Sequence, residues 1–181
     1  MPRTELSFFT RVILNIENVI MACLVPKENT GILFKWFFKI PILFYKIGLP
    51  LFGNFILLLT TTGRKTGKPR HTPLEYRRKD GSGYFIIMAG WGGNTDWARN
   101  IIKDPRVHVQ AGRNHFDAIA EKMNSEEVAA WLHHVVQINP SSIKIWSRWA
   151  GESLDGSMES RRKAAKYYPS FRLKPVQKET V

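Results

Sequence analysis

The sequence predicts an α+β fold whose centre is a mostly antiparallel, barrel-like sheet. Strand-like segments fill the middle of the chain, from residue 55 to residue 120, and helix-like segments lie on both sides of them. Most of the strands are joined by tight turns rich in glycine, asparagine or aspartate. Connections that short join antiparallel neighbours, whereas parallel strands need long crossovers. A doubly wound sheet is therefore not expected.

The composition indicates a globular chain with an anionic partner. Its 181 residues suit one hydrophobic core. The formal net charge is +12, and an excess of that size favours nucleic acid, a membrane surface or an acidic small molecule as partner. The single cysteine, Cys23, rules out an intramolecular disulfide. It fits a reducing, cytoplasmic location.

Residues 1–50 are predicted to form an amphipathic helical segment, separate from a barrel domain over residues 51–181. Apolar side chains between Phe8 and Ile20 recur at helical spacing. In the aromatic run that follows, Lys35 and Lys39 interrupt the apolar residues, a pattern typical of a helix at a membrane interface rather than across it. Peripheral membrane contact and a homodimer contact are both favoured over internal packing, and the pattern does not separate them.

The predicted strands follow from their length and composition. They cover residues 55–62, 71–77, 84–89, 106–111 and 115–120, while residues 169–176 either add a last strand or trail off. Pro73 has no backbone donor, so its strand should lie at an edge or contain a bulge. The strand over 84–89 is apolar throughout and should be buried on both faces.

The predicted helices have local start and stop signals. Asn94 or Thr95 caps a helix over residues 96–103, in which Trp97 and Ile101 share a face. Ser125 and the acidic residues after it open a second helix that ends near residue 138. Residues 141–150 and 158–167 are also expected to be helical.

The turn over residues 63–70 is the main candidate for an anion site. Its two glycines permit backbone angles that turn amides toward one anion, and four cationic side chains surround them. Only three residues separate the glycines and a strand follows, so the turn is not a P-loop. A solvated hairpin tip is the alternative, and composition alone leaves the two open.

A second glycine-rich segment, residues 90–97, leads from a strand into a helix. Free amides and the positive end of the helix favour an anion or a polar ring edge there. The alternative is a tight turn in which Trp97 only anchors the core.

Nothing in the sequence indicates a metal site. The histidines lack metal-ligand spacing, and structural or solvated roles are expected for His71, His108, His115, His133 and His134. No nucleophile motif is present either, so if the chain is an enzyme, a cofactor is expected to carry its chemistry.

Residues 55–120 closely resemble the deazaflavin-dependent nitroreductase family and the related F420-dependent quinone reductases. Two motifs in the right order carry the resemblance: Leu58–Arg70 followed by Pro73-Leu74, and Trp97 followed by Asn100-Ile101 and Lys103–Gln110. The resemblance implies a split β-barrel of the FMN-binding type that binds coenzyme F420. This cofactor carries a phosphate, a lactyl carboxylate and a glutamate tail, which would suit the basic turn.

The resemblance also implies a set of cofactor-binding residues. Those implied to hold the phosphate and tail are Arg64, Lys65 and Arg70, assisted by Lys68. Those implied to line or approach the deazaflavin ring are Ala89, Gly90, Trp91 and Trp97. Thr72 and Pro73 would pass the cofactor on their strand, and Tyr76 would lie near the acceptor pocket.

The implied activity is hydride transfer from reduced F420 to a nitro, quinone or similar electron-poor small molecule. Family members that reduce nitro compounds often have Ser-Lys where this chain has Gly90-Trp91, so the acceptor stays open. An FMN-binding split-barrel reductase and a non-catalytic, basic membrane-surface protein are the alternatives. Nucleic-acid binding is not expected, because no RNP, zinc-finger or helix-turn-helix pattern is present.

Overall fold

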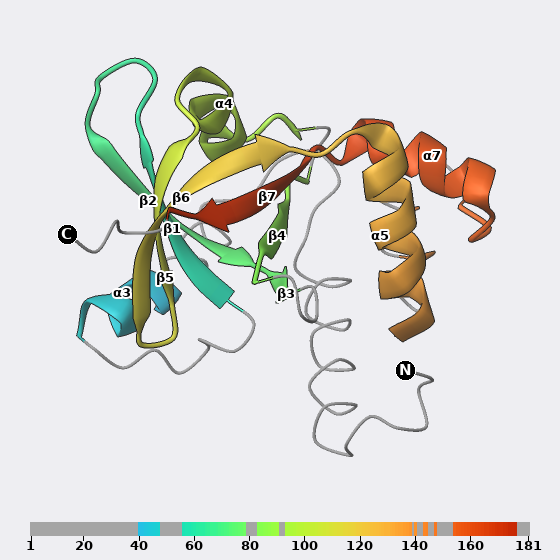
Figure 1. The fold of residues 1–181 in the computed structure, drawn as a ribbon, viewed down its shortest axis with the longest axis horizontal. Helices are drawn as coiled ribbons and strands as arrows, with labels where there is room; N and C mark the ends of the chain where they lie inside the picture. Colours follow the sequence, from blue (N-terminus) through green and yellow to red (C-terminus); the bar gives the residue numbers. More distant parts are fainter. Residues whose placement is uncertain are drawn as a thin grey trace. The chain divides into compact units, whose positions relative to one another are not determined.

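The computed structural model describes residues 40–47, 56–78, 83–90, 93–138, 140, 143–144, 147 and 154–176. The chain divides into two compact units (Figure 1). The first comprises Trp36–Met123 and Pro169–Val181, and the second includes Asn124–Tyr168. Most of the predicted N-terminal segment and of the predicted helix over 141–150 lies outside the described residues, and the predicted boundary at residue 50 stays a prediction.

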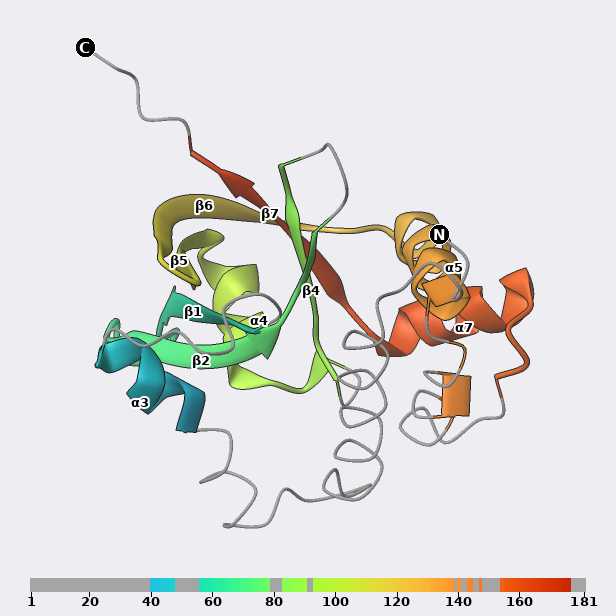
Figure 2. The ribbon, with the colours of Figure 1, turned by 90° about the horizontal axis from the view of Figure 1, so that it is seen from below.

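Within the described residues, the first unit contains one curled antiparallel sheet of seven strands (Figures 1 and 2). The strands are β1 (Ile56–Thr62), β2 (Pro69–Glu75), β3 (Arg77–Arg78), β4 (Phe85–Met88), β5 (Arg106–Ala111), β6 (Asn114–Lys122) and β7 (Ser170–Pro175). Their order is β2-β1-β5-β6-β7-β4-β3, and every neighbouring pair is antiparallel. The sheet curls until β2 approaches β4. The predicted α+β split β-barrel is thereby confirmed.

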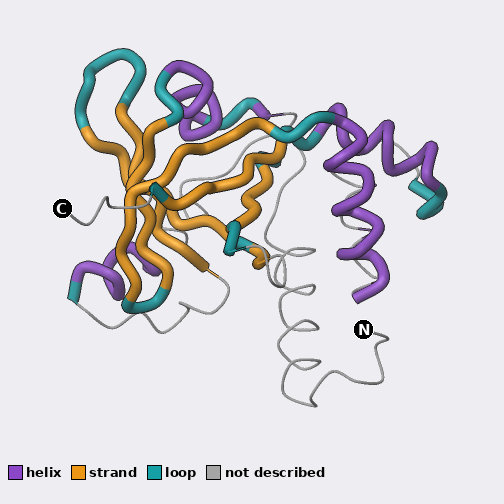
Figure 3. Tube along the Cα trace, in the orientation of Figure 1, coloured by secondary structure: helices purple, strands orange, loops and turns teal. Residues whose placement is uncertain are grey.

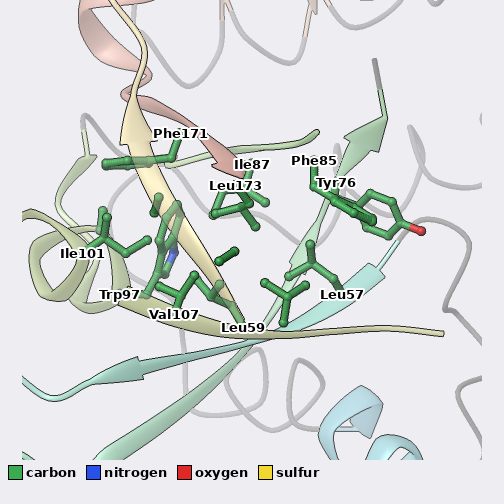
Figure 4. Close-up of a cluster of buried hydrophobic side chains, with 14 of the residues drawn as sticks. Leu57, Leu59, Tyr76, Phe85, Ile87, Trp97, Ile101, Val107, Phe171 and Leu173 are labelled. Carbon is green, nitrogen blue, oxygen red and sulfur yellow. The ribbon is translucent and has the colours of Figure 1, made fainter. Parts of the chain in front are cut away.

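The hydrophobic core fills the inside of this curl (Figure 4). Alternate residues of β1 and β5 point into it, and Leu57, Leu59 and Val109 have no exposed surface. Strands β4 and β7 add Ile87, Phe171 and other apolar side chains from the opposite wall. Because a strand turns successive side chains to opposite faces, this alternation fixes the register of the sheet.

The break after Glu75 corrects the predicted strand over residues 71–77. The chain leaves β2 there and crosses to the other end of the sheet, where Arg77 and Arg78 pair with β4. Tyr76 lies at the crossing, and its buried ring packs on Phe85 with 5.1 Å between centroids. Leu74 and Tyr76 keep the two-residue alternation of a strand, so the sequence shows no sign of the crossing. The prediction that Pro73 marks an edge strand is confirmed, because β2 ends the sheet.

The last strand, β7, lies inside the sheet between β6 and β4. The sequence left residues 169–176 undecided, yet Phe171 and Leu173 are almost fully buried there. Since β7 joins the β5–β6 hairpin to the β3–β4 hairpin, the barrel depends on the C-terminal residues of the chain.

Two helices belong to the barrel unit. Helix α4 (Asp96–Lys103) has the bounds that the sequence predicted, and it buries Trp97 and Ile101 on one face. Helix α3 (Ile40–Lys46) packs on β1 and β2. Its Tyr45 hydroxyl donates to the Ile56 carbonyl at 2.6 Å and accepts from the Gly112 N–H at 3.3 Å. Burial raises the pKa of Tyr45, so this hydroxyl stays protonated and keeps the helix attached.

The second unit contains helices α5 (Ser125–Ile138) and α7 (Met158–Tyr167), which pack against each other (Figure 3). Both have their predicted bounds. An ion pair links them, with 2.9 Å between Arg162 Nε and Glu126 Oε1. Among the described residues, none of the helices combines the length and the apolar character that a membrane crossing requires.

Candidate functional site

A cavity of about 410 Å³ lies where the β1–β2 turn, the edge of β2 and the first turns of α4 meet. Its lining consists of Gly63, Arg64, Lys65, Thr66, Arg70, His71, Thr72, Asp96, Trp97 and Asn100. The fold therefore brings the basic turn and the start of the α4 helix to one place, although they are distant in sequence. All of these residues belong to the barrel unit.

The β1–β2 turn is closed by its own backbone. The Gly63 N–H donates to the Lys68 carbonyl at 2.9 Å, and the N–H groups of Thr66 and Gly67 donate to the Gly63 carbonyl. A β-carbon at Gly63 would meet the Lys68 oxygen at 2.9 Å, and Gly67 has a φ of +67°. Both glycines are thus needed for the tight turn. The N–H groups of Gly63, Thr66 and Gly67 therefore close the turn instead of pointing toward an anion, and the cationic side chains remain as its candidate anion-binding groups.

Asn100 of α4 anchors this turn to the helix. Its Oδ1 accepts from the backbone N–H of Arg64 at 3.1 Å and from Arg64 Nη1 at 3.2 Å. Its Nδ2 donates to Thr61 Oγ1 at 3.0 Å. Asn100 is only 3% exposed, and Lys103 Nζ adds a bond to the Arg64 carbonyl at 2.8 Å. One buried amide and one lysine of α4 therefore hold four groups, three on Arg64 of the turn and one on Thr61 of β1.

Arg64 has an acidic partner as well. Its Nη1 lies 2.8 Å from Asp96 Oδ1, and this hydrogen bond holds the pKa of Asp96 below its usual range. Asp96 is therefore ionised at neutral pH and balances part of the Arg64 charge. Within the described residues, Lys65 and Arg70 are the cations of the cavity that have no ion pair.

Trp97 forms an aromatic wall of the cavity. It is 6% exposed and packs edge-on against the Phe171 ring, with 5.7 Å between centroids (Figure 4). The two interpretations of Trp97 from the sequence are compatible, since the ring anchors the core and also borders the cavity.

Of the remaining predicted site residues, those that the structure describes lie outside the cavity lining. Lys68 is exposed at the tip of the same turn, and Pro73 follows Thr72 on β2, opposite Leu58 of β1. Tyr76 is buried beside Phe85, with its hydroxyl at the edge of the cluster (Figure 4). Their roles toward a cofactor or an acceptor stay predictions.

The predicted ring-lining segment at the end of β4 is only partly described. Ala89 is fully buried in the core, and its N–H donates to the Pro169 carbonyl at 2.9 Å. Gly90 is half-buried, and a β-carbon there would meet nothing within 4 Å. Trp91 lies outside the described residues.

Sequence reasoning missed three residues of the cavity. The sequence predicts Asp96 only as the first residue of a helix, and it predicts a structural or solvated role for His71. Asn100 had a detectable signal, because a polar residue that shares the buried face of Trp97 and Ile101 needs hydrogen-bond partners. No role was assigned to it from the sequence.

A family model for F420H(2)-dependent quinone reductases matches residues 44–149, more than half of the chain and the whole cavity lining. The chain belongs to the F420H(2)-dependent quinone reductase family. An F420H(2)-dependent quinone reductase of Mycobacterium tuberculosis is 36% identical over 73 residues, which are 39% of this chain and 48% of that protein. The chain thus spans about half the length of the curated relatives it matches.

A solved structure of an F420-H2 dependent reductase is also similar to this member of the quinone reductase family. It shares 27% identity, with a TM-score of 0.47, over 66% of this chain and 93% of that one. The cavity described above lies within the part of the chain that the family model covers.

Proposed function

We propose that this chain binds coenzyme F420 in the cavity beside the β1–β2 turn and transfers hydride from the reduced cofactor to a quinone-like acceptor. The observation that carries the proposal is that Lys65 and Arg70, which have no ion pair among the described residues, meet the aromatic ring of Trp97 in one cavity. The chain's membership of the F420H(2)-dependent quinone reductase family supports F420 over FMN and over a non-catalytic role.

The polar groups of the cavity fit the anionic part of F420. Lys65 supplies a mobile charge and Arg70 a planar fork, which together suit a phosphate or a carboxylate. The hydroxyl groups of Thr66 and Thr72 add donors and acceptors along the same wall.

Two features near the start of α4 fit the ring of the cofactor. Thr95 Oγ1 is buried and has no hydrogen-bond partner among the described residues, so a polar ring edge would satisfy it. A β-carbon at Gly90 would meet no described atom within 4 Å, so the chain is open beside the end of β4, although Gly90 does not line the cavity.

When bound, F420 supplies the hydride. The chain's own residues would then hold the anionic tail, orient the ring against Trp97 and keep water away on the core side. Within the described residues no side chain is assigned as a proton donor to the acceptor.

Anaerobic turnover assays test the activity. We expect the purified chain to oxidise reduced F420 with a soluble naphthoquinone, seen as the return of the oxidised deazaflavin absorbance. Turnover with a nitroarene should be slower, and neither NADPH nor reduced FMN should replace reduced F420. A chain that binds F420 but reduces no quinone would contradict the proposed acceptor class.

We also propose that the N-terminal part of the chain contacts an anionic membrane surface. Helix α3 exposes Ile40 and Leu43, and Ile47, the residue after the helix, is exposed as well. The net charge of +12 favours anionic lipid. The full chain should float with anionic vesicles, whereas Leu43→Glu with Ile47→Glu should remain unbound. Equal flotation of the unaltered chain and the double variant would contradict membrane contact through α3. If light scattering instead shows a dimer that the double variant no longer forms, the exposed side of α3 contacts a second copy of the chain.

A further inference from the structure

The cavity follows the open edge of the sheet. Three consecutive residues of β2, Arg70, His71 and Thr72, line it, although side chains of one strand alternate between faces. β2 is the terminal strand, and Pro69 and Pro73 have no N–H to offer on it. Prolines on an edge strand oppose the addition of another strand. This edge is therefore suited to a small ligand that contacts both faces of β2.

The imidazole of His71 is oriented by a neighbour on β1. Its Nδ1 lies 2.9 Å from Thr60 Oγ1, and the two residues are directly opposite each other in the sheet. A hydrogen bond at Nδ1 leaves Nε2 as the second polar atom of the ring. Because the threonine hydroxyl can donate to Nδ1, a neutral ring can carry its proton on Nε2, and a protonated ring donates from both nitrogens. In both of these forms Nε2–H is a donor, and an anion beside Nε2 favours them over the tautomer that carries its proton on Nδ1.

We infer that His71 is a further ligand-binding residue of this cavity, with Nε2–H donating to an anionic oxygen of the phosphate or carboxylate groups of the bound cofactor. The inference rests on the proposed function, and it adds a residue that neither the turn motif nor the family resemblance assigned. Lys65 contributes a mobile charge, whereas the ring held by Thr60 contributes a donor of fixed direction. His71 would thus set the position of an anionic group that Lys65 and Arg70 attract.

His108 is a matched control on the other side of the same threonine. It lies opposite Thr60 on β5, and its side chain is also exposed. Its Nδ1 lies 2.8 Å from Asp117 Oδ1, however, and it does not line the cavity. A substitution at His108 changes the same face of the sheet without changing the proposed contact.

The test measures the affinity of the full chain and four variants for F420, for inorganic phosphate and for glutarate. His71→Leu should weaken F420 binding by about ten- to a hundredfold, the usual effect of losing a hydrogen bond to a charged group. His71→Gln, which keeps a donor near the Nε2 position, should restore most of that loss. Thr60→Val should weaken binding by about two- to fivefold, because the ring is no longer oriented. His108→Leu should bind as the unaltered chain does.

The small anions identify the group that His71 contacts. A loss confined to phosphate assigns the contact to the cofactor phosphate, and a loss confined to glutarate assigns it to the tail. In the unaltered chain, the His71 Nε2 resonance should also shift when the bound anion is added, and the His108 resonance should not.

Equal affinities of His71→Leu and His108→Leu for every probe would overturn the inference, as would an unshifted His71 resonance. An unaltered chain that binds phosphate but not F420 would overturn the proposed function and still test His71 through the phosphate titration. A chain that binds no probe would overturn both.

Discussion

The double substitution Lys65→Glu with Arg70→Glu is expected to weaken F420 binding by about a thousandfold or more. Two cations that face the ligand would become two carboxylates, and each reversal replaces a charge-assisted contact by repulsion. The free energy of unfolding should change by less than about 1 kcal/mol, because neither side chain has an ion pair within the described residues and both lie at the surface. Fluorescence titration and denaturant unfolding measure the two effects.

Lys68→Glu is the matched control for this pair. Lys68 lies in the same turn and is exposed, but it does not line the cavity. The Lys68→Glu variant should lose less than about tenfold in F420 affinity, and the difference from the unaltered chain should shrink as the salt concentration rises. An equal loss at Lys68 would mean that the turn attracts anions only through its overall charge.

Arg64→Glu should differ from the substitutions at Lys65, Lys68 and Arg70. Because Arg64 is bonded to Asn100 and Asp96, its loss should lower the free energy of unfolding as well as F420 affinity.

The second large effect is expected for Asn100→Leu. This substitution keeps the size of the side chain but leaves Thr61 Oγ1 and the Arg64 N–H without their partner. Loss of partners for buried polar groups should cost about 2–4 kcal/mol of unfolding free energy. F420 affinity should fall by about tenfold or more, because the turn that carries Lys65 is no longer fixed to α4.

Asn100→Asp separates the two halves of this anchor. The carboxylate keeps an acceptor for Arg64 but has no donor for Thr61, so the loss of stability should be smaller than for the leucine variant. An Asn100→Leu chain with unchanged stability and affinity would contradict the anchoring role. Thermal or denaturant unfolding, measured beside the F420 titration, decides between the outcomes.

The elements that the sequence predicted correctly are those with local signals. Helix α4 begins after Thr95 and stops before Asp104-Pro105 as predicted, although the Thr95 side chain makes no capping hydrogen bond. Helices α5 and α7 likewise have their predicted bounds. Strand β5 alternates cleanly between buried and exposed residues. In each case propensity, periodicity and turn residues agree within a few residues of the element.

The features that could not be predicted depend on partners distant in sequence. The place of β7 between β6 and β4 follows from pairings with both, and nothing within residues 170–175 encodes it. The crossing at Tyr76 also leaves no signal in the sequence. Leu74 and Tyr76 keep the two-residue alternation of one strand, although the chain passes there from β2 at one edge of the sheet to β3 at the other.

The contrast between local signals and partners distant in sequence also explains which residues of the candidate site could be predicted. The basic turn is visible because its charges and glycines are contiguous. The anchoring role of Asn100 depends on Thr61 of β1, and the orientation of His71 depends on Thr60. Those contacts exist only once β1, β2 and α4 have come together. The partial neutralisation of Arg64 by Asp96 was hidden for the same reason.

The most direct test of the central claim is a fluorescence titration of the purified full chain with coenzyme F420 and, side by side, with FMN. We expect saturable F420 binding that weakens as salt rises and is at least about a hundredfold tighter than FMN binding. Tighter binding of FMN would keep the barrel and contradict the cofactor, and the absence of binding by either would contradict the proposed function of the cavity.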